Sequence, residues 1–504
     1  MKGAGSVLRS NIASTVGISS IGFLVSFASQ IVISYHFGAS AQLDAYWAAF
    51  ALMNLLAFPL TPLRDALVPE FHRRLREDAK AASTYFSRAM TLILLVSAIG
   101  TLAGWLLAEP LTTLAVSAKQ PQVRALAVGQ LYWLAPAILL LAFSETLNSI
   151  MSSYHRVVMQ AFARLLGMVA ALAVLGLFAG MLQSHVLPLS VIAAQATIAL
   201  AQVVVLRREG LVFRPAWPRD LGERFLAVGG ALLATYAASQ AYSVLEKHTL
   251  TSFSAGLVSS FQYSVALTNV LITLVGVSLS NVLWPRFLDH AAGEERGRLY
   301  ADVTVAVRLA LLVMGWLCAL VWINATALIE LVYARGAFDA LAVTRTASAL
   351  RIAVFAAVPI SVGLLMGRAL ISLGAARSVM VVGLATTLAG SGVLMAARFL
   401  GSPDLALSHW LLANLVGMAT YMLLLARACG VLQSSYGRAV WWMVRWLVIL
   451  LLAGIVVQAI PIAKPGLAAL VMDAILRTVA FSTVFFVLTW FTGMFQGLPP
   501  LWRR

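Results

Sequence analysis

The sequence contains few cysteines and few charged residues. Its two cysteines, Cys318 and Cys429, both fall within apolar stretches of the 504-residue chain. Two isolated thiols in such stretches imply neither a disulfide framework nor a thiolate metal site. Charged residues make up 11% of the chain and hydrophobic residues 61%, with a mean hydropathy of +0.91. This composition excludes a soluble globular domain, so most of the chain must lie in a lipid bilayer.

Motifs for covalent chemistry are also missing. The sequence has no phosphate-binding glycine loop with its lysine, no His-Glu-x-x-His pair and no nucleophile elbow. Its seven histidines fall in loops or at the ends of apolar stretches, without the spacing of metal ligands. We interpret them as interfacial side chains. The sequence therefore predicts a protein that is not an enzyme and that uses no cofactor or metal.

Long apolar stretches dominate what is present. A helix needs about 20 mostly apolar residues to cross a hydrocarbon core roughly 30 Å thick, because no water is there to satisfy exposed backbone groups. The sequence predicts about fourteen such helices, at residues 12–35, 44–66, 89–108, 126–151, 157–181, 187–206, 225–245, 257–283, 303–332, 347–373, 378–398, 405–427, 440–461 and 468–493. We therefore expect an all-α polytopic membrane protein whose first helix is retained rather than cleaved as a signal peptide.

The formal net charge of +16 is distributed unevenly along the chain. In a soluble protein it would indicate nucleic-acid binding, but here the basic residues gather in alternate loops between the predicted helices. Those loops contain Arg73, Arg74, Arg76 and Lys80; His155 and Arg156; Arg207, Arg208, Arg214 and Arg219; and Arg296 and Arg298. The positive-inside rule places these loops and both termini in the cytoplasm, although the loop with Arg335, Arg345 and Arg351 departs from the pattern. We expect no nucleic-acid partner.

The second half of the chain echoes the first. Pro69 and Pro285 lie at the ends of two predicted helices, 216 residues apart, and Pro136 and Pro359 are 223 residues apart. Several weak matches at nearly one separation indicate an internal repeat. The predicted units are a six-helix lobe at 1–215, a second six-helix lobe at 216–430 and two further helices at 431–504. Because six is even, both lobes enter the membrane from the same side and the repeat is parallel.

Charged residues inside the predicted helices are few, and each costs roughly 2.5–3.5 kcal/mol at the bilayer centre on insertion scales. They are Asp44, Arg64, Asp65, Glu145, Arg164, Glu246, Lys247, Arg308, Arg351, Arg368, Asp473 and Arg477. The 223-residue separation makes Glu145 and Arg368 equivalent positions of opposite charge. We interpret both as facing a central cavity; the alternatives are a helix-packing ion pair or two separate polar contacts. Lys247, beside Glu246, is expected to pair with lipid at the outer surface.

Two closely spaced pairs of charges have simpler interpretations. Arg64 and Asp65 are adjacent and cannot share a helix face, so one of them is expected to turn toward water or headgroups. Asp473 and Arg477 are spaced i, i+4 and are expected to pair with each other.

Two short stretches are the most informative in the chain. Phe37-Gly38-Ala39-Ser40 is followed by Asp44 and Tyr46, and Arg335-Gly336-Ala337-Phe338 is followed by Ala347 to Leu350. Together with Gly256 to Tyr263, Pro285-Arg286 and Arg368-Ala369, they resemble the lipid II flippases of the MurJ (MviN) type, a branch of the multidrug/oligosaccharidyl-lipid/polysaccharide exporter superfamily. The likeness covers most of the first twelve predicted helices. It implies two six-helix lobes, with two extra helices in many members.

The resemblance also implies a function. Family members flip an undecaprenyl-pyrophosphate-linked saccharide from the cytoplasmic to the outer leaflet of the bacterial inner membrane by alternating access, using a cationic central cavity. Lipid II, or a related lipid-linked oligosaccharide, would be the substrate, and peptidoglycan biosynthesis the process. Membrane lipids and glycan-assembly enzymes would be the other partners. Without nucleotide machinery, transport would draw on an ion gradient, the membrane potential or substrate flow.

A diphosphate headgroup favours arginine, whose planar fork matches phosphate oxygens. The candidates for substrate binding are Arg64, Arg164, Arg308, Arg351 and Arg368. The candidates for gating or ion coupling are Asp44, which matches a functional position of the family directly, together with Asp65, Glu145 and Lys247.

The chain departs from the family pattern at the cationic cavity. The family's first helix usually carries an Arg, a Gly and an Arg-Asp pair, where this chain has Phe23, Ser26, Ser29 and Gln30. In the second helix the family's usual arginines are replaced by Ala57 and Phe58. In the eighth helix the family's Tyr-Ala-Asp-Arg is replaced by Tyr263-Ser264-Val265-Ala266. Either the protein serves another lipid-linked saccharide, such as an exopolysaccharide repeat unit, or it recognises phosphate with Arg64, Arg351 and Arg368. The rival functions are a multidrug or cation antiporter, which would need acidic residues in a lobe pocket, and a nontransporting scaffold for glycan assembly.

Overall fold

The computed structural model describes residues 2–219, 223–430, 445–446, 448–450, 452–455, 467–492 and 494. All regular secondary structure in these residues is helical. Within them, nine helical stretches are long and apolar enough to cross a membrane, or up to eleven when each of two bent helix pairs counts as one span. The prediction of an all-α polytopic membrane protein is confirmed, whereas the number fourteen stays a prediction. The predicted span at 440–461 lies largely outside the described residues.

The chain divides into two compact units. Unit 1 comprises Met1–Ser259 and Arg335–Asp339, and unit 2 comprises Ser260–Ala334 and Ala340–Arg504. The lobe limits predicted from the repeat, at residues 215 and 430, stay a prediction.

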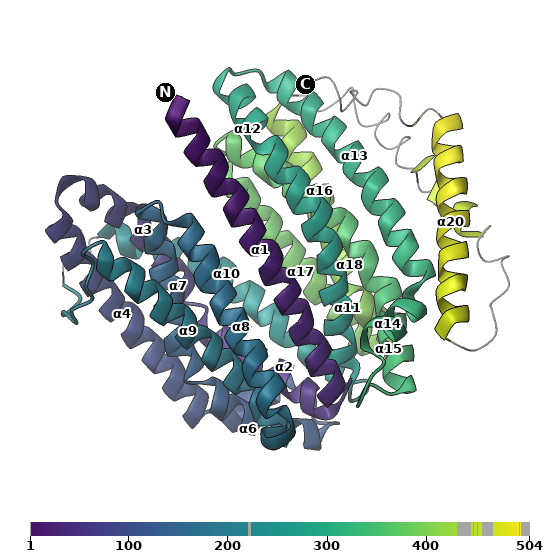
Figure 1. The fold of residues 1–504 in the computed structure, drawn as a ribbon, viewed down its shortest axis with the longest axis horizontal. Helices are drawn as coiled ribbons and strands as arrows, with labels where there is room; N and C mark the ends of the chain where they lie inside the picture. The colour runs from purple at the N-terminus through teal and green to yellow at the C-terminus, as the bar shows by residue number, and fades with distance from the viewer. Residues whose placement is uncertain are drawn as a thin grey trace. The chain divides into compact units, whose positions relative to one another are not determined.

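Unit 1 is a bundle of helices around an alanine- and leucine-rich core. Its helices are α1 (Lys2–Phe37), α2 (Ala41–Ala57), α3 (Leu60–Glu77), α4 (Ala79–Leu106), α5 (Ala108–Ala115), α6 (Pro121–Leu134), α7 (Ala137–Ser153), α8 (Val157–Leu182), the short 3₁₀ helix η1 (Gln183–His185), α9 (Val186–Arg208) and α10 (Glu223–Thr251). In Figure 1, α8 lies beside α1, and the contacts between helices place α8 against α9 and α10 against α2 and α3. Small side chains such as Ala45 and Ala49, both fully buried, allow this close approach of helices.

Unit 2 repeats much of this pattern. Its helices are α11 (Leu257–Leu271, whose first residues belong to unit 1), the π-helix η2 (Ile272–Val277), α12 (Ser278–Ala292), α13 (Arg296–Ile323), α14 (Ala325–Tyr333), α15 (Ala340–Ala353), the 3₁₀ helix η3 (Val354–Ala356), α16 (Ala357–Ser372), α17 (Ala376–Leu400), α18 (Pro403–Ala428) and α20 (Leu467–Phe491). Helix α16 packs against α12, α13 and α18, and α17 packs along α18. Phe481 and Phe485 of α20 pack into a cluster with Leu312 and Ala319 of α13.

Two predicted helices of the first half are broken, and unit 2 is interrupted at equivalent places. Helices α2 and α3 meet at Pro59 with a bend of 45°, and α6 and α7 meet at Pro136 with a bend of 48°. Proline has no backbone N–H, so it ends or bends a helix where it occurs. The position 216 residues after Pro59 lies inside the π-helix η2, and Pro359 follows the 3₁₀ turn η3. The breaks therefore support the internal repeat.

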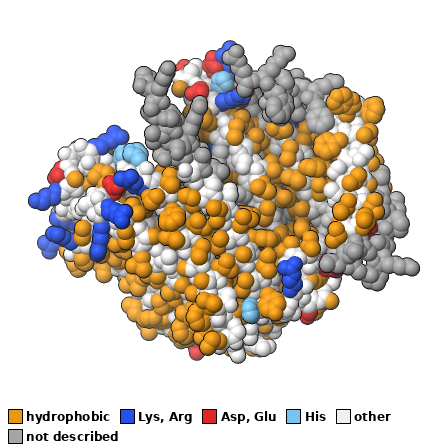
Figure 2. Space-filling model, in the orientation of Figure 1, with side chains coloured by type: hydrophobic (Ala, Val, Ile, Leu, Met, Phe, Trp, Pro, Cys, Tyr) orange, Lys and Arg blue, Asp and Glu red, His pale blue; other side chains and the backbone are white. Residues whose placement is uncertain are grey.

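The surface of the helices is apolar. Figure 2 shows hydrophobic side chains covering most of the visible helical surface, with Lys and Arg gathered near helix ends. Leu106 and Met181 in unit 1 are each 79% exposed, and Phe399 in unit 2 is 91% exposed. Exposed apolar side chains in such numbers would be unfavourable in water, whereas lipid tails solvate them. The protein is therefore a multi-pass membrane protein.

Candidate functional site

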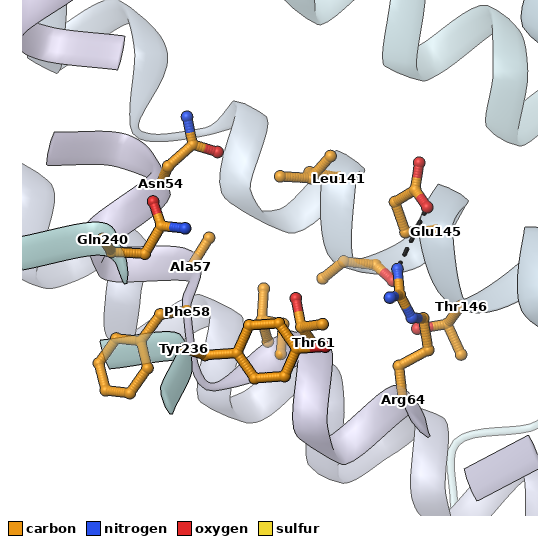
Figure 3. Close-up of a pocket in the computed structure, with 12 residues that line it drawn as sticks. Asn54, Ala57, Phe58, Thr61, Arg64, Leu141, Glu145, Thr146, Tyr236 and Gln240 are labelled. Atoms are coloured by element: carbon orange, nitrogen blue, oxygen red, sulfur yellow. Dashed lines mark hydrogen bonds and ion pairs between the residues drawn. The ribbon is translucent and has the colours of Figure 1, made fainter. Parts of the chain in front are cut away.

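A polar pocket lies inside unit 1, between α2, α3, α7 and α10. Its volume is about 160 Å³. The lining residues are Asn54, Ala57, Phe58, Leu60, Thr61, Arg64, Leu141, Ala142, Glu145, Thr146, Tyr236 and Gln240. Figure 3 shows Arg64 and Glu145 reaching toward one another at one end of this pocket, with Asn54 and Gln240 at the other. Residues far apart in sequence thus bring amide, hydroxyl, guanidinium and carboxylate groups to one place within apolar helices.

Arg64 is the cation of this pocket. Its Nη1 donates to Oε2 of Glu145 at 3.2 Å, and its Nη2 and Nε donate to Oδ1 of Asp65 at 3.3 and 3.4 Å. The side chains are partly accessible, at 23% for Arg64 and 37% for each carboxylate. Because the guanidinium lies between two carboxylates, the free energy of placing each charge among apolar helices is lower than it would be for that charge alone.

Asp65 also takes part in this network. Its Oδ2 accepts a hydrogen bond from the hydroxyl of Tyr236 on α10 at 3.1 Å. Arg64 and Asp65 therefore contact each other although they are adjacent in sequence, and the expectation that one of them faces water or headgroups stays a prediction. The side chains of adjacent residues point in different directions from a helix, but the arginine side chain of Arg64 is long enough to bend over the helix surface and reach Asp65. Tyr236 was missed because nothing in its sequence context distinguishes it from an interfacial tyrosine.

The charges of this network do not favour a phosphate ligand. One guanidinium faces two carboxylates, so the cluster of Arg64, Asp65 and Glu145 carries one excess negative charge when all three are ionised. A phosphate that approached Arg64 would be repelled by the two carboxylates beside it. The arrangement is better suited to a cation or a proton than to an anion.

Arg368 on α16 belongs to a second polar contact, inside unit 2. Its Nη1 donates to the backbone carbonyl of Ser280 at 3.0 Å, and its Nη2 donates to Oδ1 of Asn281 at 2.5 Å. The guanidinium carbon also lies 5.5 Å from the ring centroid of Trp284, within the range of a cation–π contact. All three partners lie on α12.

The two contacts are related by the repeat. The 223-residue separation pairs Glu145 with Arg368, and the 216-residue separation that aligns Pro69 with Pro285 also aligns Asp65 with Asn281. The first contact joins α3 to α7, and the second joins α12 to α16. Both units thus have an arginine at the same helix–helix contact. In unit 1 it is Arg64 on α3, the first helix of its pair, and in unit 2 it is Arg368 on α16, the second helix of its pair. The 216-residue separation would have identified Asn281 from the sequence as the residue equivalent to Asp65.

The sequence allows three interpretations of Glu145 and Arg368. The structure shows the third, two separate polar contacts, one within each unit. Their exposure to a shared central cavity stays a prediction. The expected pairing of Asp473 with Arg477 on α20 is confirmed, because Oδ2 and Nε lie 3.0 Å apart.

The other candidate arginines lie apart from these contacts. Arg351 on α15 donates to the hydroxyl of Thr326 at 2.9 Å. Arg308 is half-buried on α13. Arg164 on α8 lines a separate cavity of about 250 Å³ in unit 1, formed with Thr15, Ser19 and Gly22 of α1. The sequence grouped these arginines by their chemistry, and their role in substrate binding stays a prediction.

Asp44 is fully buried in unit 1. Its carboxylate accepts hydrogen bonds from the backbone N–H groups of Gly256 at 2.6 Å and Ser259 at 2.7 Å, and from the Ser259 hydroxyl. These N–H groups lie at the start of α11, where helix N–H groups lack partners within the helix and a negative charge is favoured. Asp44 therefore acts as a remote cap for this helix end.

Lys247 and Glu246 form an ion pair inside unit 1, where the two residues are 5% and 9% exposed. This burial contradicts the expectation that Lys247 pairs with lipid at the outer surface. The polar heads of lipids cannot reach a side chain that neighbouring helices cover.

The two sequence stretches that carry the family resemblance meet in unit 1. The N–H of Ala337 donates to the carbonyl of Tyr35 at 2.8 Å. Gly38 has φ +55° and Gly336 has φ +59°. A Cβ added to Gly38 would collide with the Ala337 carbonyl, and one added to Gly336 would collide with the Tyr35 carbonyl. Glycine is needed at both positions for the left-handed backbone and for the close approach of the two stretches of the chain.

Comparison with solved structures identifies the fold. An inward closed conformation of the lipid II flippase MurJ superimposes with a TM-score of 0.74 at 14% identity, covering 94% of this chain and 98% of that one. An inward-facing multidrug resistance MATE family transporter of the MOP superfamily gives 0.64 at 14% identity, over 84% and 99%. A MOP superfamily transporter from Pyrococcus furiosus gives 0.59 at 15% identity, over 85% and 96%.

These likenesses define the fold class: a helical membrane protein with the fold of the MOP superfamily transporters. The sequence pattern of the family described as "Lipid II flippase MurJ" matches residues 33–475. The chain belongs to the MurJ lipid II flippase family.

Proposed function

We propose that this protein is a flippase that moves an undecaprenyl-pyrophosphate-linked saccharide, lipid II or a related lipid-linked oligosaccharide, from the cytoplasmic to the outer leaflet by alternating access. The match to the MurJ family over residues 33–475 carries this proposal. Alternating access requires parts of the protein that move as rigid bodies, and the two compact helical units are suited to this. Their helix surfaces are apolar, so each body can move within lipid.

The rest of the functional assignment follows from the same proposal. The protein resides in the bacterial inner membrane with both termini in the cytoplasm, serves peptidoglycan biosynthesis and catalyses no covalent reaction. Its partners are membrane lipids and the enzymes that assemble glycans. Transport uses an ion gradient or the membrane potential, and the network of Arg64, Asp65 and Glu145 is the candidate coupling site because its excess carboxylate can take up a cation or a proton.

A second candidate is a cation or multidrug antiporter. The observation that favours it is the excess negative charge beside the unit 1 pocket, which suits a cationic substrate better than a phosphate. A third is an exopolysaccharide repeat-unit flippase, which the loss of the family's cavity arginines favours.

Complementation tests these candidates. The protein is expressed in bacteria depleted of their own lipid II flippase, and growth is followed together with the accessibility of lipid II to an external probe. Restored growth and accessibility are expected. If the protein reaches the membrane and restores neither, lipid II is not its substrate. Increased resistance to cationic drugs in the same cells would then favour the antiporter.

A further inference from the structure

Arg368 lacks an acidic partner among the described residues. Its contacts there are a carbonyl oxygen, an amide oxygen and an indole ring, all neutral. The repeat-related junction in unit 1 has two carboxylates around its arginine. A half-buried guanidinium in an apolar bundle is costly without a counter-charge. The junction in unit 2 is therefore electrostatically incomplete, and an anionic ligand would complete it.

The guanidinium is also held in place with donors to spare. An arginine side chain has five N–H donors, and the contacts with Ser280 and Asn281 use two of them. The Trp284 ring, whose centroid lies 5.5 Å from the guanidinium carbon, adds a third contact. An arginine held in this way loses little side-chain entropy on binding, so its free donors are preorganised for phosphate oxygens.

Arg368 is also one of the residues that line a mostly apolar groove on the other side of its contacts with α12. The volume of the groove is about 390 Å³, within the range of roughly 300–1,000 Å³ that ligand pockets occupy. It lies between α16, α17 and α18 and is lined by Pro359, Ile360, Gly363, Leu364, Gly367, Arg368, Ile371, Val379, Thr386, Asn414, Gly417, Met418 and Tyr421. Apart from Arg368, none of these side chains carries a charge.

Glycines on α16 let Tyr421 of α18 pack closely along one wall of the groove. A Cβ on Gly363 would lie 3.4 Å from the Tyr421 ring, and one on Gly367 would lie 3.1 Å from its hydroxyl. Larger side chains at these positions would fill the space between α16 and α18. The combination of one preorganised cation with an open apolar groove matches a molecule with a charged phosphate end and a branched hydrocarbon chain.

We propose that Arg368 and this groove, the α16 groove, bind the diphosphate end of a polyprenyl lipid, with the first isoprenoid units lying among the apolar side chains. This inference rests on the proposed function and adds to it the place where the carrier lipid is recognised. Recognition of phosphate lies in unit 2 at Arg368, whereas Arg64 in unit 1 is neutralised by its carboxylates.

Binding measurements on the purified full-length protein in detergent test the proposal. The probes are undecaprenyl diphosphate, undecaprenol, which has the same chain without the diphosphate, and phosphatidylglycerol. Arg368→Gln is expected to weaken the binding of undecaprenyl diphosphate about tenfold or more, because it removes charge-assisted hydrogen bonds, and to leave undecaprenol binding unchanged. Arg398→Gln, which removes an exposed arginine near the end of α17, is the matched control and should change neither.

A second variant addresses the chain rather than the headgroup. Gly363→Leu is expected to weaken the binding of both undecaprenyl diphosphate and undecaprenol, since the leucine side chain occupies the α16 groove. Its unfolding temperature in detergent verifies that the protein is folded. Unchanged binding of undecaprenyl diphosphate to Arg368→Gln would overturn the proposal. Equal binding of phosphatidylglycerol would also overturn it, because the groove would then be a general phospholipid site.

Failure of this inference can be told apart from failure of the proposed function. If the wild-type protein restores no lipid II exposure in depleted cells but binding of undecaprenyl diphosphate depends on Arg368, the α16 groove stands and the transport of lipid II falls. If the wild-type protein restores exposure and Arg368→Gln alters neither exposure nor binding, the flippase stands and the α16 groove falls.

Discussion

The Nη1 of Arg64 lies 3.2 Å from Oε2 of Glu145, and this contact joins α3 to α7 within unit 1. In unit 2 the residue equivalent to Glu145 is an arginine, and the residue equivalent to Asp65 is Asn281. The junction is kept in both units, but among the described residues its arginine faces carboxylates only in the first. The two copies of this contact therefore differ in charge.

We expect Arg64 and Glu145 to be coupled only modestly, because both side chains are partly accessible. A double-mutant cycle with Arg64→Gln and Glu145→Gln should give a coupling free energy of about 0.5–1 kcal/mol. Arg64→Gln should be the more destabilising single change, because it leaves two carboxylates without their cation. Denaturant unfolding of the detergent-solubilised protein measures both effects. Additive single changes, with no coupling, would contradict the ion pair.

Asp44→Ala is expected to destabilise the protein by about 2–4 kcal/mol. It leaves the buried N–H groups of Gly256 and Ser259 without their acceptor, and such unsatisfied donors cost about 1–3 kcal/mol each, less what relaxation recovers. Thermal unfolding in detergent measures the loss. Asp404→Asn, at an exposed position in the first turn of α18, is the control and should stay within about 0.5 kcal/mol of the wild type. Equal unfolding of Asp44→Ala and the wild type would refute the capping role.

Gly336→Ala and Gly401→Ala separate two costs that glycine avoids. Both glycines have positive φ, +59° and +66°, which should cost an alanine about 1–2 kcal/mol. Gly336 also faces the backbone carbonyl of Tyr35, whereas nothing lies within 4 Å of a Cβ on Gly401. Gly336→Ala should therefore lower the unfolding temperature more than Gly401→Ala. A larger loss from Gly401→Ala would contradict the close approach seen in unit 1.

Cysteine labelling tests the orientation that the basic loops predict. Cys318 and Cys429 are both buried, so the background of labelling should be low. Glu77→Cys lies at the exposed end of α3, which the positive-inside rule places in the cytoplasm, and Lys119→Cys lies in an exposed loop that the same rule places on the other side. In intact cells an impermeant maleimide should label Lys119→Cys and leave Glu77→Cys unlabelled until the cells are opened. The reverse pattern would place both termini outside.

Sequence reasoning was most successful where composition and periodicity determine the result. The helical membrane fold and the pair Asp473–Arg477 both follow from local patterns, because lipid requires helices and because i, i+4 neighbours share a helix face. It was least successful for long side chains next to one another. The curl of Arg64 back to Asp65 and the burial of Lys247 beside Glu246 depend on which helices cover them, and no local pattern records that.

The sequence by itself determined that this chain spans a membrane as helices and that it carries few internal charges, and it predicted that the two halves are related. Only the tertiary structure decided which of those charges meet. It set Arg64 between two carboxylates and placed Arg368 among neutral groups, although both lie at the same junction of the repeat. The physical reason is that the free energy of an ion in a bilayer depends on partners within about 4 Å, and those partners come from helices that are distant in sequence.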